Sequence, residues 1–278
     1  MHSARLPLAG ILVRSDRSAR RVRRVLPTVR AIYVESTIPP ADYLLIAVPD
    51  DSVGRCAAAL ANQLGGRPGT ALHTSGVLPA AVLAPLARRQ WSVGSFHPLT
   101  AFPRPGGPLV PLRGILAAIE GEPAALRVAR SLAKRLAIRV HLIDPRAKPR
   151  YHAAAALAAN LTHILVVAAR QQFQQVGLSR RGAAEALAPL VFGAISSALA
   201  STGWEHLTGA VVRHDLVTVR RHLRVLPPDL AEAYAALARF AADHMESDRS
   251  SASIAFREQL AALTLTRRYA SVRRDDAT

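Results

Sequence analysis

The first half of the chain alternates short apolar runs with segments in which apolar residues recur every three or four positions. The clearest apolar run is 43–48, and a segment of helical spacing follows it at 53–63. Short apolar runs bounded by turn residues are typical of strands. The same pattern predicts further strands at 10–13, 31–34, 70–73, 91–96, 115–119 and 139–143, with helices at 18–26, 79–88 and 123–136. Strands that alternate with helices in this way predict an α/β fold with a parallel, doubly wound sheet.

After Asp144 the pattern changes, and no strand is predicted in the rest of the chain. Helical patterns cover 153–176, 183–200, 215–225, 228–245 and 251–265. Pro228 suits the first turn of one of these helices, and the composition of 144–149 is typical of a linker. We therefore expect two domains, an α/β domain over residues 1–145 and an all-α helical domain over residues 146–278.

Composition narrows the class of protein. Apolar residues make up 50% of the 278 residues and charged residues 20%, which excludes a disordered chain. The single cysteine, Cys56, excludes a disulfide scaffold and a cysteine-based zinc site. The most apolar run, 153–169, contains Asn160 and His163 and is too short and too polar for a membrane span. With no convincing targeting segment, we expect a cytoplasmic protein without a membrane partner.

The net charge of +17 arises from 36 basic and 19 acidic residues. Such a charge is typical of proteins that bind nucleic acids. However, only Lys134 and Lys148 are lysines, and the arginines are scattered, which indicates a compositional bias. The densest arginine cluster, 17–24, has helical spacing and no aromatic residues for base stacking. We interpret it as a solvated helix face that could serve an anionic ligand, and we expect no nucleic-acid partner.

Five segments together resemble one protein family. They are 46–51 (IAVPDD), 73–76 (HTSG), 94–99 (GSFHPL), 119–123 (IEGEP) and 151–160 (YHAAAALAAN). The set is similar to bacterial Rossmann-like oxidoreductases with a helical C-terminal domain of unassigned function, in the 6-phosphogluconate dehydrogenase-like superfamily. Ketopantoate and pyrroline-carboxylate reductases are relatives. The resemblance, over residues 8–245, implies NADP as cofactor, a dinucleotide-binding first domain, and a helical domain that binds substrate and forms a homodimer.

The chain departs from this family at its start. Dinucleotide-binding domains open with a strand and a Gly-x-Gly-x-x-Gly turn, whose backbone N–H groups approach the pyrophosphate. The sequence contains no such motif, and 10–15 (GILVRS) resembles the second strand of the family. We expect that the first strand and helix are missing through a start codon assigned too late. A decayed or altered protein is the alternative. Loss of that central strand would expose two sheet edges.

Six residues at two strand ends are candidates for binding the cofactor: Arg14, Ser15, Arg17, Val48, Pro49 and Asp50. The first three follow the first visible strand, where a basic and hydroxyl pair suits the 2′-phosphate of NADP and an acidic residue would indicate NAD. The other three end the strand 43–48, and ligands lie outside the carboxyl ends of parallel strands. A solvated turn and a helix cap, respectively, are the alternatives.

Candidates for substrate binding follow the next two strands. In His73, Thr74, Ser75 and Gly76, two hydroxyls, an imidazole and a glycine suit a carboxylate or carbonyl oxygen. A Ser/Thr turn with a buried histidine has the same pattern. His97 ends the next strand, so that two histidines can face one cleft. A two-histidine metal site lacks a nearby carboxylate ligand, and we therefore expect no metal.

The first helix of the second domain carries Tyr151, His152, Asn160 and His163. At about 100° per residue, His152 and His163 lie about 20° apart, and Asn160 shares their side of an apolar helix. In the superfamily a polar group on this helix faces the nicotinamide. This implies catalytic roles for His152 and Asn160 and substrate contact for His163, whereas buried histidines bonded to carbonyls are the alternative. Arg213, in a later turn, could hold an anionic substrate group or be a surface arginine.

These features lead us to expect an NADP-dependent oxidoreductase that reduces the carbonyl or imine carbon of a small acid. A 2-oxo acid is one substrate that the resemblance implies. His97 or His152 would donate the proton, and Asn160 with the hydroxyls of Thr74 and Ser75 would hold the substrate. The alternative is a non-catalytic binding or assembly protein that has lost the cofactor loop. If the enzyme hypothesis is correct, the strand ends and the polar side of the helix should converge on one concavity.

Overall fold

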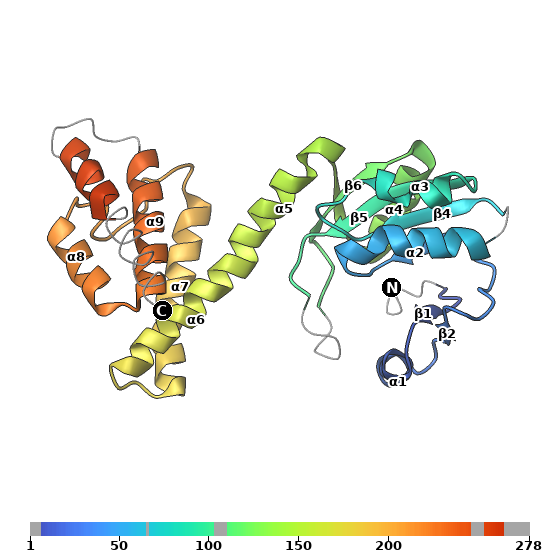
Figure 1. Ribbon diagram of the computed structural model, residues 1–278, viewed down its shortest axis with the longest axis horizontal. Helices are drawn as coiled ribbons and strands as arrows, with labels where there is room; N and C mark the ends of the chain where they lie inside the picture. Colours follow the sequence, from blue (N-terminus) through green and yellow to red (C-terminus); the bar gives the residue numbers. More distant parts are fainter. Residues whose placement is uncertain (1–6, 65–66, 103–109, 246–252, 264–278) are drawn as a thin grey trace, which may run out of the picture. The chain divides into compact units, whose positions relative to one another are not determined.

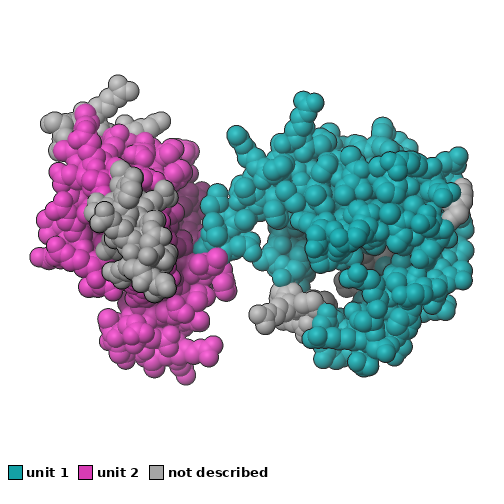
Figure 2. All heavy atoms as spheres, in the orientation of Figure 1, with its two compact units in different colours: residues 1–161 teal, residues 162–278 magenta. Residues whose placement is uncertain are grey.

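The computed structural model describes residues 7–64, 67–102, 110–245 and 253–263. The chain forms two compact units, Met1–Leu161 and Thr162–Thr278 (Figures 1 and 2). The first unit extends past the segment 144–149 that the sequence suggested as a linker. The helix α5, Lys148–Ala156, therefore belongs to the same unit as the sheet.

The first unit contains a five-stranded sheet in the order β3-β4-β5-β6-β7 and a separate sheet of β1 and β2. The strands are β1 Ile11–Val13, β2 Ala31–Tyr33, β3 Tyr43–Ile46, β4 Gly69–His73, β5 Trp91–Pro98, β6 Leu116–Gly121 and β7 Arg139–Leu142. The predicted Rossmann-like parallel sheet is confirmed, with one difference: β5 and β6 are antiparallel. The described part of the β5–β6 connection contains no crossover helix, and a strand that returns without one runs antiparallel.

The two sheets are separate at a defined place. In the described part of the chain, β1 pairs only with β2 and β3 pairs only with β4. The usual strand order 3-2-1-4-5 has one strand between these two edges. The small sheet is held elsewhere: Leu12 packs against the core that contains Ile46, and Nε2 of Gln63 donates to the carbonyl of Val34 at 2.9 Å. The five-stranded sheet therefore begins at β3.

Helices cover both faces of the five-stranded sheet (Figure 1). They are α2 Asp50–Gln63, η2 Ala80–Leu83 and α3 Ala84–Ala87 on one face and α4 Pro123–Leu136 on the other. A further helix, α1 Asp16–Val25, connects β1 to β2. The buried side of α4 consists of Ala125, Ala129 and Ala133, at intervals of four residues. These small side chains allow the helix to pack closely on the sheet.

The helical region contains α6 Thr162–Gln175, α7 Arg180–Ala200, α8 Leu216–Val225, α9 Pro228–His244 and a helix at residues 253–263. Between α5 and α6 the chain forms a π-turn, Leu157–Leu161. Such a turn acts as an extra residue in the helix, so a constant rotation of about 100° per residue does not hold across it. The expectation that His152, Asn160 and His163 share one side rested on that constant rotation, and its premise is wrong.

Two helical stretches, Pro145–Gln175 and Arg180–Ala200, are long and apolar enough to cross a membrane on length and composition alone. The first is longer than the apolar run 153–169 that the sequence analysis considered, because the helix continues through the π-turn. In the most apolar part of the first stretch 0% of the residues are buried, and in that of the second 11% are buried. Length and composition are weak evidence for a membrane span, and among the described residues few of these apolar side chains are fully buried.

Candidate active site

The site begins with the turn that follows β4. His73, the last residue of β4, is fully buried, and its Nδ1 accepts the backbone N–H of Ser75 at 3.1 Å. The hydroxyl of Ser75 accepts the backbone N–H groups of residues 77 and 78 at 3.3 and 3.0 Å. These hydrogen bonds close the turn, and they occupy Nδ1 of His73 and the hydroxyl oxygen of Ser75 as acceptors. Thr74 is half-buried, and Gly76 lies at the bend.

The imidazole rings of His97 and His152 both lie close to Gly76. A Cβ atom placed on this glycine would lie 2.5 Å from Nδ1 of His152 and 2.9 Å from Nε2 of His97. The two rings meet edge to face, with centroids 5.8 Å apart. A side chain at position 76 would leave no room for both rings. The structure thus brings together three residues that the sequence placed on a turn, a strand end and a helix.

Tyr151, in the first turns of α5, completes this histidine cluster, which consists of Gly76, His97, Tyr151 and His152. Its Oη lies 2.9 Å from Nδ1 of His97, and the rings meet edge to face at 5.5 Å. Burial raises the pKa of Tyr151, and a hydrogen bond from the backbone N–H of Ala118 opposes this shift. Ala118 lies directly opposite His97 in the β5–β6 pair. The sequence pattern alone indicated no role for Tyr151.

The environment keeps two of the histidines neutral. Burial lowers the pKa of His97 to about 4, and the positive charge of His152 and Lys148 adds to the shift. Burial also lowers the pKa of His73 to about 4, with Lys148 as the second cause. The carboxylate of Asp50, at the start of α2, acts in the opposite direction on both rings. At neutral pH both rings therefore form hydrogen bonds as neutral imidazoles and are not available as imidazolium acids.

A buried ion pair lies next to this cluster. Nζ of Lys148 is 3.5 Å from Oε1 of Glu120, and their side chains are 1% and 4% exposed. Nζ also donates to Oγ of Ser95 at 2.7 Å and to the carbonyl of Ser75 at 3.3 Å. Oε1 of Glu120 accepts the backbone N–H of Ala80 at 2.6 Å. The pair thus joins β5, β6, the turn after β4 and the first residue of α5.

The sequence pattern did not predict this ion pair, because the composition around Lys148 is typical of a linker and Glu120 has no motif that indicates a role. One signal was available. Lys148 is one of only two lysines among 36 basic residues, so its retention in an arginine-rich chain points to a specific requirement. A guanidinium is larger and planar, whereas the compact ammonium of lysine fits between Glu120 and Ser95.

The candidates for cofactor binding lie at the ends of β1 and β3. Arg14 and Arg17 are exposed, and neither forms an ion pair within the described ranges. The hydroxyl of Ser15 instead caps α1 by accepting the N–H of Ser18 at 3.3 Å. Residues 48–50 follow β3, where Pro49 caps α2 without a side-chain hydrogen bond. The guanidinium groups fit a 2′-phosphate, whereas a glycine-rich cradle for a pyrophosphate is not found among the described residues.

Three other predicted site residues are exposed. Asn160 lies in the π-turn of the first unit, and His163 and Arg213 belong to the second unit. Their roles in substrate binding stay predictions. Among the residues that the structure describes, no three histidine, cysteine or carboxylate side chains are grouped as ligands for a metal ion.

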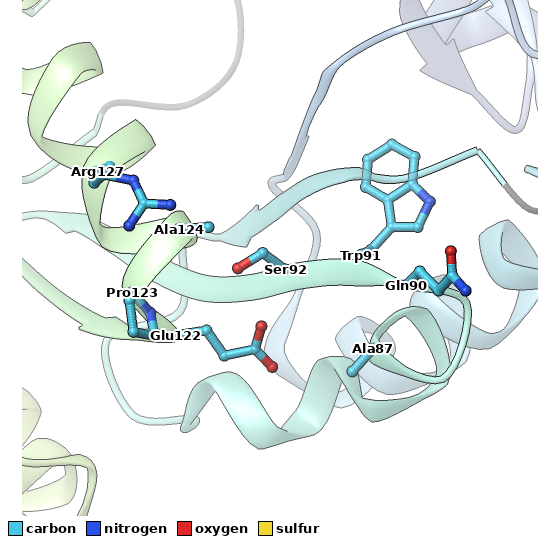
Figure 3. A pocket seen from close by; sticks show the side chains of 8 residues that line it. All are labelled: Ala87, Gln90, Trp91, Ser92, Glu122, Pro123, Ala124 and Arg127. Atoms are coloured by element: carbon cyan, nitrogen blue, oxygen red, sulfur yellow. The ribbon is translucent and has the colours of Figure 1, made fainter.

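A cavity of about 440 Å³ lies at the other end of β5 (Figure 3). Trp91, the first residue of β5, lines it together with Glu122 and Arg127, which approach from the start of α4. Ser92, also in its wall, caps α4 by accepting the N–H of Ala125 at 3.1 Å. None of the predicted site residues lines this cavity, which lies at the opposite end of β5 from His97.

Comparison with known protein families identifies both parts of the chain. Residues 2–100 match a Rossmann-like domain, and residues 115–241 match a domain of unknown function, DUF2520. No curated protein matches the chain significantly.

Solved structures share this architecture. A candidate NADP oxidoreductase from Bacteroides fragilis superposes with a TM-score of 0.74 at 19% identity, over 86% of this chain and 90% of its own. A protein from Thermotoga maritima has a TM-score of 0.61 at 21% identity, over 86% and 91% of the two chains. A candidate oxidoreductase from Pseudomonas putida has a TM-score of 0.56 at 15% identity, over 89% and 88%. The resemblance drawn from the sequence is confirmed in its domain content: a Rossmann-like domain is followed by a helical DUF2520 domain, whose function is unknown.

Proposed function

We propose that this chain is an NADP-dependent oxidoreductase that reduces the carbonyl or imine carbon of a small acid. The observation that carries the proposal is the histidine cluster, in which His97 and His152 meet over Gly76 where β4 and β5 end. Ligands in open α/β sheets bind outside the carboxyl ends of the strands, which is where this cluster lies. The fold shared with the B. fragilis protein, described as a candidate NADP oxidoreductase, supports the same reaction class.

NADP would supply the hydride, which no side chain can provide. Arg14 and Arg17 would hold its 2′-phosphate, and residues 48–50 would border it at the end of β3. Because the described residues include no glycine-rich cradle, we expect the affinity of this chain for NADPH to be weaker than micromolar.

The low pKa of His97 supports a different division of roles between the two histidines. His97 is neutral at physiological pH, so it can polarise a substrate by donating a hydrogen bond but cannot supply a proton as an imidazolium. We assign the proton to His152, whose Nδ1 is buried against Gly76. His73 and Ser75 would act by shaping the turn, and the hydroxyl of Thr74 would contact the substrate.

The proposal is tested by NADPH binding in calorimetry and by NADPH oxidation with a panel of 2-oxo acids and cyclic imino acids. His152→Asn should reduce the rate at least about 100-fold, because it removes the proton donor. His222→Asn is the matched control, since His222 also lies beside a tyrosine, in α8 of the second unit. An equal loss in both variants would contradict the assignment.

The runner-up function is a non-catalytic binding or assembly protein. The division of the sheet between β1 and β3, together with the missing glycine-rich turn, is the observation that favours it. Complete absence of NADPH binding, in a chain whose unfolding is cooperative, would support this alternative and refute the enzyme.

We also propose that the chain forms a homodimer through its long helices. Exposed apolar side chains gather on α6 and α7, including Ile164 at 58%, Phe192 at 68% and Leu199 at 82%. Large uncovered apolar surfaces are typical of interfaces with another protein chain or a membrane. Light scattering should give twice the mass of one chain, and Phe192→Asp should lower the measured mass toward that of one chain. A monomer of the unaltered chain that sediments with lipid vesicles would contradict the dimer.

A further inference from the structure

We propose that α1 carries a binding site for an oligophosphate anion. This arginine site consists of Arg17, Arg20, Arg21 and Arg24, whose side chains together line a hollow of about 400 Å³. The proposed function uses only Arg17 of these residues and assigns no role to the other three. The arginine site lies beside the two-stranded sheet of β1 and β2, so it depends neither on the histidine cluster nor on the reaction.

The spacing of the four arginines places them on one side of α1. Each of them lies three or four residues from two of the others, which brings side chains together on the surface of a helix. Three of the side chains are exposed, and that of Arg21 is half-buried. The hollow has the size that is typical of small-molecule sites, about 300–1,000 Å³. One small ligand can therefore reach all four guanidinium groups.

The packing of α1 turns this side toward solvent. Ala19, in the middle of the helix, is fully buried, and α1 packs against β1 and β2. The hydroxyl of Ser15 caps the first turn by accepting the N–H of Ser18. At the same end of the helix, the hydroxyl of Tyr33 in β2 donates to the carboxylate of Asp16. These contacts hold α1 against the small sheet and leave the arginine site open to a ligand.

The positive charge of this region exceeds that of its carboxylates. Residues 10–36 contain seven arginines and two acidic residues, Asp16 and Glu35, which gives a net charge of +5. Elsewhere an arginine has an acidic partner, as Arg181 has Glu185 at 2.7 Å. Within the described ranges, no residue of the arginine site forms an ion pair. Because like charges at this spacing destabilise a helix, a bound anion would stabilise α1.

The guanidinium groups and the size of the hollow select the ligand. Arginine binds phosphate oxygens through two parallel N–H bonds and stays charged at physiological pH. One phosphate carries at most about two negative charges, whereas a chain of three carries about four, one for each guanidinium group. The sequence of α1 contains no aromatic residue on which a base could stack. An oligophosphate, free or as the phosphate chain of a nucleotide, therefore fits the site better than a nucleic acid.

Helix α8 provides a matched control. Three of its arginines have the same spacing as the last three of the arginine site, and all three are exposed: Arg220, Arg221 and Arg224. They belong to the second unit and do not line the hollow. The α1 triple variant carries Arg20→Gln, Arg21→Gln and Arg24→Gln, and the α8 triple variant carries glutamine at its three matching positions. Both variants lose three charges and keep residues of similar helix propensity, so they differ only in where the charge is lost.

The experiment is calorimetric titration of the full chain with sodium tripolyphosphate, at neutral pH, in about 0.05 M salt and without divalent cations. The α1 triple variant should bind tripolyphosphate at least about tenfold more weakly than the unaltered chain. The α8 triple variant should change the affinity less than about twofold. Inorganic phosphate should bind at least about tenfold more weakly than tripolyphosphate, because it carries fewer charges. Circular dichroism checks that both variants keep the helix content of the unaltered chain.

ATP, which carries a chain of similar length, distinguishes the two sources of the ligand. Similar or tighter binding of tripolyphosphate would identify a free oligophosphate, and tighter binding of ATP would identify a nucleotide. Both results support the site if the α1 triple variant loses the binding. Equal losses in the two triple variants would overturn the proposal, because net charge alone would then attract the anion. Absence of binding at millimolar tripolyphosphate, or tighter binding of a DNA duplex of about 20 base pairs, would overturn it as well.

A second measurement uses the unaltered chain and does not depend on the folding of any variant. In a ¹H–¹⁵N spectrum of the full chain, tripolyphosphate should shift the backbone amide signals of α1 and leave those of α8 in place. Equal shifts at the two helices would contradict a site on α1. Absence of NADPH binding would refute the proposed function without changing either result, so the failures of the two proposals are distinguishable.

Discussion

Replacing the buried lysine tests the network that supports the site. Lys148→Met keeps the apolar stem of the side chain and removes the ammonium group. It leaves the carboxylate of Glu120, only 4% exposed, with the N–H of Ala80 as its hydrogen-bond donor. It also removes the donors to Ser95 and to the carbonyl of Ser75. The turn after β4 and the start of α5 should both loosen.

The expected loss of stability is about 3–5 kcal/mol, the usual cost of leaving one partner of a buried pair uncompensated. The double variant Lys148→Met, Glu120→Gln removes both charges and should cost less than the sum of the single variants by about 1–3 kcal/mol. Burial lowers the pKa of Lys148 although Glu120 opposes the shift, which indicates that desolvation is the larger effect here. A neutral pair should therefore be tolerated better than a lone charge.

The assay is urea unfolding followed by tryptophan fluorescence in a Trp204→Phe background. Trp91, at the start of β5, is 3% exposed and then reports on the first unit alone. This separation matters because a chain with two units need not unfold in a single step. The control is Lys134→Met, which replaces the only other lysine of the chain, exposed in the last turn of α4.

The control should change stability by less than about 0.5 kcal/mol, as exposed substitutions usually do. If Lys148→Met costs no more than Lys134→Met, the buried pair does not support the fold. If the two single variants add up to the double variant, the groups are not coupled, and the reasoning about the network is refuted.

Three further predictions follow from the site. Gly76→Ala should lower the free energy of unfolding by about 1–3 kcal/mol through overpacking, and it should displace the rings of His97 and His152. Urea unfolding measures the first effect, and the NMR signals of the histidine rings measure the second. Gly54→Ala, whose Cβ would meet Val82 at an ordinary 3.5 Å, should have neither effect. Arg14→Glu should weaken NADPH binding at least about tenfold more than NADH binding, because it replaces attraction to the 2′-phosphate with repulsion; equal changes would show that it does not contact the ribose. His73 and His97 have folded pKa values of about 4, below the usual 6.5, so the unfolded chain binds protons first. The contribution of these two histidines to the free energy of unfolding should therefore be fully present above about pH 6.5 and decline as the pH falls toward 4. In urea titrations at several pH values, His97→Asn should make this decline smaller.

Local patterns were sufficient for much of this protein. The spacing of apolar residues predicted α4 at 123–136 with its observed bounds, and it placed β4 and β5 within a few residues of their observed ends. The rule that ligands gather where parallel strands end then selected His73 and His97 from sequence order. These inferences depend on residues within one element, where the period of the apolar positions reflects a single buried face.

Only the tertiary structure decided the parts that join distant segments. Lys148 meets Ser75, which precedes it by 73 residues, and Tyr151 meets His97 across 54 residues, so neither contact has a local signature. β6 runs antiparallel to β5, and the described part of their connection contains no crossover helix. The π-turn at Leu157–Leu161 changes the rotation of a helix whose composition shows no break. The sequence by itself determined the two-domain α/β and helical architecture and which residues lie at the strand ends. The tertiary structure decided which of them touch, because burial of a charge or a ring is compensated by whatever partner the fold brings near.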